Sequence, residues 1–259
     1  MKSPSFIYTY NLVSKIFSWI FLIKFVLAIA TFASFAYISN WRFAVLLMLA
    51  IGFHEQGHIW AMNKMGISNR GAFSVPFFGA ATIPKEQYKS YYQHAFVYLM
   101  GPSFGACMAL ATYLLSAVLH SPILAASAAW IAMLNAFNLI PMVPLDGGQT
   151  IKSLLFSVGR KTGFTYISLS LVVLVYSMIH YKIWFLGILI LAGAADFTLE
   201  ILKSNKDIGW GKDIVMQSKM SISQAIWMFA WYVCVSLALF AVIKSTIVIP
   251  QIHNKFLYF

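Results

Sequence analysis

The chain has 259 residues, of which 61% are hydrophobic and only 10% are charged. Soluble domains carry about 25% charged residues, so this composition excludes an ordinary soluble domain and indicates a membrane protein. The net charge is +11. The basic residues lie in short loops between apolar stretches and form no continuous face, so we expect them to meet lipid headgroups and we expect no nucleic-acid binding.

The apolar stretches are long enough for transmembrane helices, which need about 20 residues each. In chain order they predict spans at about residues 16–38, 43–65, 92–119, 123–140, 166–179, 183–195 and 225–242. We therefore expect an all-α polytopic membrane protein with six to seven transmembrane helices. The segment between the fourth and fifth predicted spans is expected to be a polar stretch that ends at Gly163. Lys24 lies within the first span, and its sequence position does not decide whether it faces lipid headgroups or the bundle.

One segment departs from this helical pattern. Residues 72–83 read AFSVPFFGAATI, which is rich in β-formers and bounded by glycine and proline. This composition predicts a short membrane-associated strand or hairpin. Irregular backbone at membrane depth is tolerated only against protein or a wet cavity.

The basic residues also predict an orientation. With seven spans and a cytoplasmic N-terminus, only Arg42, Lys182, Lys244 and Lys255 fall on the far side, and Lys24 falls within a span. The other thirteen of the 18 Lys and Arg are then cytoplasmic, which is a positive-inside pattern. We expect an integral, multi-pass protein of the cell membrane (plasma or inner), with its N-terminus and the opening of its site towards the cytoplasm.

The second span contains His54-Glu55-Gln56-Gly57-His58. Residues four apart share one helical face, so both imidazoles can bind one metal ion, and Glu55 can act as a base beside it. By chance this motif is expected roughly once in several hundred chains of this composition. A charge at mid-span costs about 2.5–3.5 kcal/mol, which favours a functional role. The alternative is a neutral Glu55 hydrogen-bonded between helices, with both histidines bound to backbone carbonyls.

A catalytic zinc site needs a third protein ligand and keeps one open position. Asp146 is a candidate, because Pro-Leu-Asp-Gly-Gly follows a helix that returns to the side of the paired histidines. The flanking glycines allow a close backbone approach. Asp146 could equally cap the helix that follows Gly147. The residues alone leave both interpretations open. Asp196 and Glu200, at the end of a later span, are expected to be solvated.

Two motifs together resemble a known family. HEQGH in one span and NLIPMVPLDGG (138–148) at the end of a later span are similar to the site-2 protease family of intramembrane zinc metalloproteases, peptidase family M50, and the similarity extends over 43–148. It implies one Zn²⁺ per chain, held by His54, His58 and Asp146, with Glu55 as the general base.

The resemblance also implies that Asn138 lies near the metal, where it orients the substrate or stabilises the tetrahedral intermediate. The implied substrates are transmembrane proteins or peptides cleaved in or near their spans, as in regulated intramembrane proteolysis. Substrate must be extended for attack, so we expect Phe77, Phe78, Gly79 and Ala80 of the β-rich segment to bind it by strand addition.

We expect a single membrane-embedded domain over 1–259, with a catalytic core at about 43–148 and C-terminal helices at about 166–246. Many relatives carry a polar residue, often Asn, soon after the Gly101-Pro102 pair, where this chain has Ser-Phe-Gly. Many also carry a PDZ or CBS domain, which we do not expect here. Two other functions stay open, a membrane metal transporter and an inactive family member that acts as a binding scaffold. Neither the substrate nor the oligomeric state is indicated by the sequence.

Overall fold

The structure is a computed structural model that describes residues 22–76, 79–184, 186–204 and 217–247. A first helix is described over Leu22–Ile38. It is followed by α2 (Trp41–Lys64), β1 (Asn69–Val75), β2 (Gly79–Pro84), α3 (Tyr91–Val118), α4 (Pro122–Asn138), α5 (Asp146–Val158), α6 (Arg160–Tyr181), α7 (Leu186–Ser204) and α8 (Ile222–Ile247). The mostly helical class is confirmed, and so is the hairpin predicted at 72–83, where β1 and β2 pair antiparallel.

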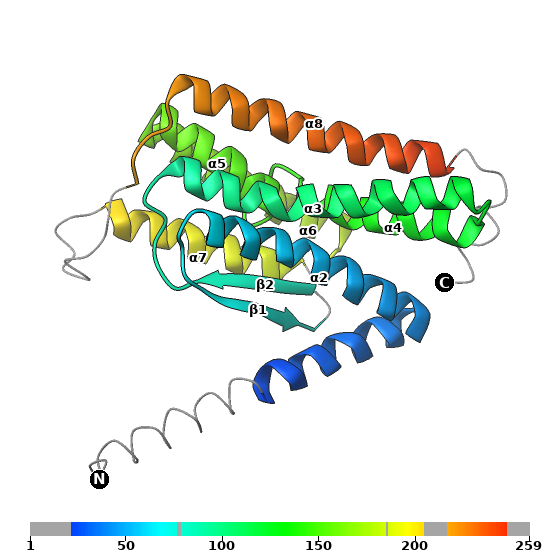
Figure 1. Cartoon of the computed structure of the whole chain (residues 1–259). Coiled ribbons are helices and arrows are strands. Elements are labelled where there is room, and N and C mark those ends of the chain that lie inside the picture. Colours follow the sequence, from blue (N-terminus) through cyan, green and yellow to red (C-terminus); the bar gives the residue numbers. More distant parts are fainter. Residues whose placement is uncertain (1–21, 77–78, 185, 205–216, 248–259) are drawn as a thin grey trace, which may run out of the picture.

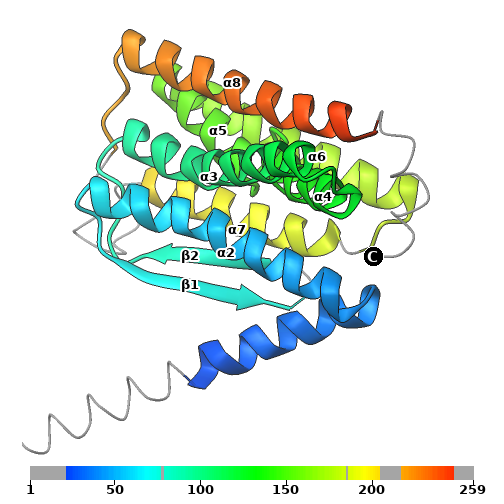
Figure 2. The same cartoon turned by 45° about the vertical axis from the view of Figure 1, so that its right-hand side comes forward.

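Helix α2 is the element around which the site is built. Figures 1 and 2 show it between the β hairpin on one side and α3 on the other, with α8 covering the far side of α3 and α4. Helix α3 also packs against α4 and α5. Helix α2 therefore packs against α3 and α4 from later in the chain and against both strands of the hairpin.

The helices begin where the sequence supplies capping residues. The Asn40 side chain accepts hydrogen bonds from the first backbone N–H groups of α2, Ser90 accepts one at the start of α3, and Ser121 accepts one at the start of α4. Pro122 follows as the first residue of α4, a position where its missing N–H is not needed. Helix α3 continues through Pro102 as one helix.

Small residues bring the central helices close together. A Cβ on Gly57 of α2 would lie 2.3 Å from the backbone oxygen of Met100 on α3, so only glycine permits this approach. Helix α4 buries a run of alanines against its neighbours. Small residues of this kind are typical of helix interfaces in membranes, where close backbone approach replaces the hydrophobic effect.

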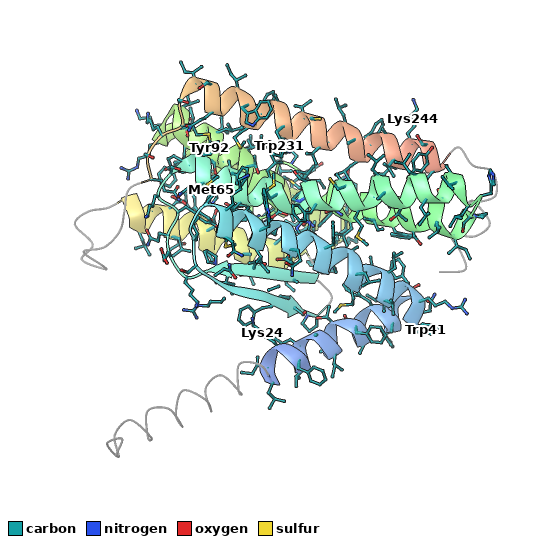
Figure 3. The ribbon with its side chains drawn as sticks, viewed as in Figure 1. Lys24, Trp41, Met65, Tyr92, Trp231 and Lys244 are labelled. Carbon is teal, nitrogen blue, oxygen red and sulfur yellow. The ribbon has the colours of Figure 1, made fainter. Side chains whose placement is uncertain are left out.

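The outer helices present apolar surface. Large exposed side chains of α6 and α8 include Val172, Ile179, Phe229 and Phe240, which is the surface expected towards lipid. On the inner side of α8, Trp231 donates a hydrogen bond from Nε1 to Ser103 Oγ of α3 at 3.1 Å (Figure 3). By length and composition, α3, α6 and α8 are able to span a membrane. Six to seven spans are not confirmed by the described helices, since α4 and the described part of the first helix are shorter apolar helices.

Two expectations are corrected at α5 and α7. The polar stretch expected before the fifth span is the helix α5, whose polar face is buried and includes Gln149, Lys152 and Ser153. Asp196 and Glu200 of α7 are not simply solvated, because Lys152 Nζ contacts Asp196 Oδ2 at 2.8 Å and Glu200 Oε1 at 3.4 Å. Lys152 is only 2% exposed, and a buried cation of this kind needs such partners.

Lys24 has a defined place in the structure. Its Nζ donates a hydrogen bond to the backbone oxygen of Arg70 at 2.6 Å and lies 4.3 Å from the ring centre of Phe73, so it joins the first helix to β1 (Figure 3). The attraction between an ammonium and an aromatic face supplies part of this contact.

Candidate metal centre

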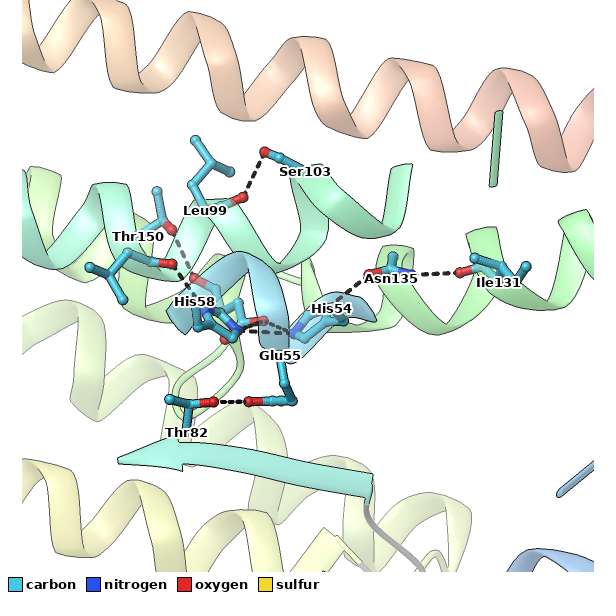
Figure 4. A network of polar contacts seen from close by, with 11 residues as sticks. His54, Glu55, His58, Thr82, Leu99, Ser103, Ile131, Asn135 and Thr150 are labelled. Carbon is cyan, nitrogen blue, oxygen red and sulfur yellow. Dashed lines mark hydrogen bonds and ion pairs between the residues drawn. The ribbon is translucent and has the colours of Figure 1, made fainter. Parts of the chain in front are cut away.

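The two histidines of α2 lie one helical turn apart and point to the same place. His54 and His58 are 4% and 6% exposed, and their Nε2 atoms are 3.0 Å apart (Figure 4). The spacing of four residues explains this geometry, because positions i and i+4 lie above one another on a helix. Both rings lie against α3, where Gly101 leaves them space.

Asp146 completes the cluster from the first residue of α5. Its Oδ2 lies 3.0 Å from His54 Nε2 and 3.5 Å from His58 Nε2. Leu145, and not Asp146, is the N-cap residue of α5, so the capping role considered from the sequence does not account for this aspartate. A tetrahedral zinc site with ligands at about 2.0–2.1 Å has neighbouring ligand atoms roughly 3.3 Å apart. The three separations agree with that arrangement.

The tautomers of both histidines follow from their other ring nitrogens. His54 Nδ1 donates to Asn135 Oδ1 and His58 Nδ1 donates to the backbone oxygen of Val97, each at 2.8 Å. Asn135 in turn donates from Nδ2 to the backbone oxygen of Ile131 at 2.8 Å, which turns its Oδ1 towards His54. With a proton on each Nδ1, the neutral rings present bare Nε2 lone pairs, as metal-bound histidines do.

The carboxylate of Asp146 faces the Nε2 lone pairs of both histidines. Its Oδ2 is buried and has no hydrogen-bond partner, although both Nε2 atoms lie within ion-pair distance of it. Two Nε2 lone pairs and one carboxylate oxygen thus face one another, and this arrangement is repulsive unless a cation or an added proton lies among them. Two imidazoles and one carboxylate form a ligand set that zinc uses in catalytic sites, so the residues present fit a zinc ion.

Glycines around the cluster make it possible. A Cβ on Gly101 would lie 2.3 Å from His58 Nε2, and one on Gly105 would lie 1.9 Å from Asn135 Oδ1. A Cβ on Gly147 would lie 2.1 Å from the backbone oxygen of Leu139. The close approach of neighbouring groups to the backbone therefore requires glycine at these positions. This agrees with the close approach expected from the sequence for the glycines after Asp146. The space beside Gly105, soon after Gly101-Pro102, is filled by a polar group from α4.

Glu55 points away from the histidine face of α2 and towards the hairpin. It is 5% exposed, and its Oε2 accepts a hydrogen bond from Thr82 Oγ1 of β2 at 2.5 Å (Figure 4). A buried carboxylate needs such a donor. The Glu55 carboxylate is thus not part of the cluster of three possible metal ligands.

Tyr88, in the loop between β2 and α3, lies in the electrostatic field of this cluster. Burial raises the pKa of its hydroxyl above the usual value, and the negative charge of Asp146 raises it further. The phenol therefore stays protonated through the physiological range and keeps its capacity to donate a hydrogen bond.

The other predicted residues have mixed outcomes. Asn138 is the last residue of α4 and is half-buried, and its role near the metal stays a prediction. Phe77 and Phe78 lie outside the described residues. Gly79 is buried at the start of β2 and Ala80 is half-buried, packed near α2, so substrate binding there also stays a prediction.

Sequence reasoning missed Asn135, which contacts His54 directly. It lies three residues before Asn138 on the same helix, in an otherwise apolar and alanine-rich segment. A lone amide in such a helix is a signal, because a buried amide needs polar partners. The rotation of α4 about its axis decides which asparagine reaches the histidine, and the sequence does not specify that rotation.

Comparison with known proteins found similarities over parts of the chain. The family model of peptidase family M50 matches residues 42–128, which hold α2, the hairpin, α3 and the start of α4. A Synechocystis protein named as a zinc metalloprotease is 29% identical over 120 residues, which is 44% of this chain and 31% of that protein. Residues 42–128 are therefore similar to peptidase family M50.

The match thus spans about a third of the length of this curated relative. The solved structure of the site-2 protease from Methanocaldococcus jannaschii is also similar, with 19% identity, a TM-score of 0.47, and coverage of 71% of this chain and 88% of that one. The family-model match ends before Asp146, so the place of Asp146 as a possible third ligand depends on the geometry of this chain alone.

We predict that Gly101→Ala displaces the two histidines and lowers zinc affinity at least about 100-fold, the upper end of what loss of a supporting partner costs. The added Cβ would overlap His58 Nε2 at 2.3 Å and His54 Nε2 at 2.7 Å. Titration of the purified protein with a zinc chelator measures the change. Gly52→Ala is the matched control on α2, where a Cβ has no neighbour within 4 Å. Equal zinc affinity in both variants would contradict the site.

We predict that Asn135→Leu weakens zinc binding by about 10- to 100-fold, the range for residues that orient a metal-bound histidine. Leucine keeps the volume and removes the Oδ1 acceptor of His54. Asn138→Leu is the comparison, because its predicted role concerns substrate and leaves zinc affinity unchanged. The same chelator titration distinguishes them, and the opposite ranking would exchange the roles of the two asparagines.

Proposed function

We propose that this protein is an intramembrane zinc metalloprotease that hydrolyses peptide bonds in or near transmembrane segments of other membrane proteins. The observation that carries the proposal is the convergence of His54 Nε2, His58 Nε2 and Asp146 Oδ2 within 3.5 Å of one another, with the buried Glu55 beside them. Three protein ligands with a neighbouring carboxylate are the ligand and base set of a hydrolytic zinc site.

Each residue has a separate role in this proposal. His54, His58 and Asp146 hold one Zn²⁺, which when bound polarises the scissile carbonyl and lowers the pKa of its water to about 7. Glu55 takes up the proton of the attacking water and passes it to the leaving nitrogen. Asn138 orients the substrate or stabilises the tetrahedral intermediate.

The hairpin is proposed to receive the substrate. Helical substrate carbonyls are shielded by their own hydrogen bonds, so the segment to be cut must be extended. Among the described residues the sheet has only β1 and β2, so the other edge of β2 is available for strand addition, with 77–80 as its contact region.

A proline scan across 75–81 is expected to lower cleavage without loss of zinc. Cleavage that survives every position of the scan would rule out strand addition.

The setting of the reaction follows the charge pattern of the chain. The seven-span arrangement predicted from the sequence puts thirteen basic residues on one side. On this basis we propose a multi-pass protein of the cell membrane whose site opens towards the cytoplasm and whose cleavage releases cytoplasmic fragments of its substrates. We also propose that 1–259 acts as one membrane-embedded unit. We further propose that substrates are first trimmed by another protease or delivered by a separate partner, as in regulated intramembrane proteolysis.

Two other functions find less support. A metal transporter needs successive ligand sets along a path, and the described part of the chain contains one group of three metal-binding side chains. An inactive scaffold is expected to have lost a ligand or the base, yet Glu55 is present, and His54, His58 and Asp146 lie close together.

We predict that Glu55→Gln lowers cleavage at least about 100-fold, within the range for loss of a general base, while zinc content stays at that of the wild type. Quantitative proteomics of membrane stubs that accumulate in cells carrying the variant identifies substrates, and purified protein then cleaves them. Glu86→Gln is the control, since Glu86 is exposed in the loop before α3. Full cleavage by the Glu55→Gln variant would refute the assigned base and the proposed function.

A further inference from the structure

We infer that Thr82 is a positioning residue for the general base, so that the strand proposed to receive the substrate also fixes the orientation of Glu55. The inference rests on the proposed function. Its structural basis is the 2.5 Å hydrogen bond from Thr82 Oγ1 to Glu55 Oε2, which joins β2 to α2 across 27 residues of sequence.

The strand geometry makes this contact specific. Side chains alternate between the two faces of a strand, and β2 follows that rule, with Ala80 and Thr82 half-buried and Ala81 and Ile83 exposed. Thr82 is the only residue of β2 with a polar side chain. A shift of β2 by one residue would present an apolar side chain to Glu55, and a shift by two would present Ala80 or a proline.

The register of the hairpin fixes that position. Thr82 is paired with Ala72, and the pairing continues without a gap through Ala81 with Phe73 to Val75 with Gly79. The irregularity in the ladder lies on the other side, between Asn69 and Ala72. Thr82 is therefore the last position of the regular ladder, directly opposite the buried carboxylate.

The hydrogen bond has two chemical effects. It supplies a donor to a carboxylate that is 5% exposed and that has lost water as a partner. It also engages Oε2, so that Oε1 is the oxygen that takes the proton of the attacking water. A carboxylate held by one oxygen has a fixed orientation, and misplacement of a reacting group by about 1 Å can cost about 100-fold in rate.

The test compares Thr82→Val, which keeps the shape and removes the hydroxyl, with Thr82→Ser, which keeps the hydroxyl. We expect Thr82→Val to lower kcat by about 10- to 100-fold, the range for loss of a hydrogen bond to a charged group, with KM changed less than about twofold and zinc content unchanged. Thr82→Ser recovers most of kcat. Thr198→Val, which removes an exposed hydroxyl bonded within α7, is the control for loss of a threonine hydroxyl.

A second readout does not depend on activity. The chain has three glutamates, Glu55, Glu86 and Glu200, so carboxyl-¹³C glutamate gives few infrared bands, and the Glu55→Gln variant assigns the band of Glu55. In metal-free protein this band is expected to shift in Thr82→Val and to stay in place in Thr82→Ser and Thr198→Val.

The outcomes separate the two proposals. An unchanged Glu55 band in Thr82→Val, a Thr82→Ser variant as slow as Thr82→Val, or a rise in KM with unchanged kcat would each overturn the positioning role. Cleavage that survives Glu55→Gln would instead overturn the proposed function, and the infrared comparison still decides whether Thr82 holds the carboxylate.

Discussion

The structure depends on one electrostatic constraint, in which three lone-pair acceptors are held together in a buried site. His54 Nε2, His58 Nε2 and Asp146 Oδ2 lie 3.0–3.5 Å apart, and the hydrogen bonds made by both Nδ1 atoms leave no ring proton between them. Such a cluster is costly unless a cation occupies it. The cluster therefore persists only if the surrounding helices hold all three side chains in place. The packing of the rest of the fold provides these constraints.

Helix α2 directs the side chains of His54 and Glu55 towards different neighbours. Consecutive residues of a helix point about 100° apart, so His54 and Glu55 cannot face the same neighbour. His54 turns towards α3 and α4, where Asn135 holds it, and Glu55 turns towards β2, where Thr82 holds it. These two adjacent residues therefore have their partners on different elements, a helix for His54 and a strand for Glu55.

The sequence predicted the parts of the site that depend on local spacing. The histidine pair followed from a four-residue interval, the hairpin from β-rich composition, and Asp146 from a Pro-Leu-Asp-Gly-Gly segment strengthened by family resemblance. It did not predict Asn135, because the rotation of α4 depends on packing. It missed α5 as well, since paired glycines and polar residues are poor helix signals in isolation. The buried partners of Lys152 depend on where α7 lies, and pattern alone does not specify that position.

The helices that follow Asp146 explain how the third ligand is held. Tyr232 of α8 donates a hydrogen bond to the backbone oxygen of Leu139 at 2.6 Å, and Tyr166 of α6 donates one to that of Gly148 at 3.3 Å. Lys152, less than two turns after Asp146 on α5, is held by the carboxylates of α7. Three helices beyond the region matched by the family model therefore fix the segment on either side of Asp146. A ligand that follows a loop with two prolines has little local rigidity, so its position must come from these distant contacts. The helices α6, α7 and α8 therefore help to position Asp146, although none of them contributes a residue to the cluster of His54, His58 and Asp146.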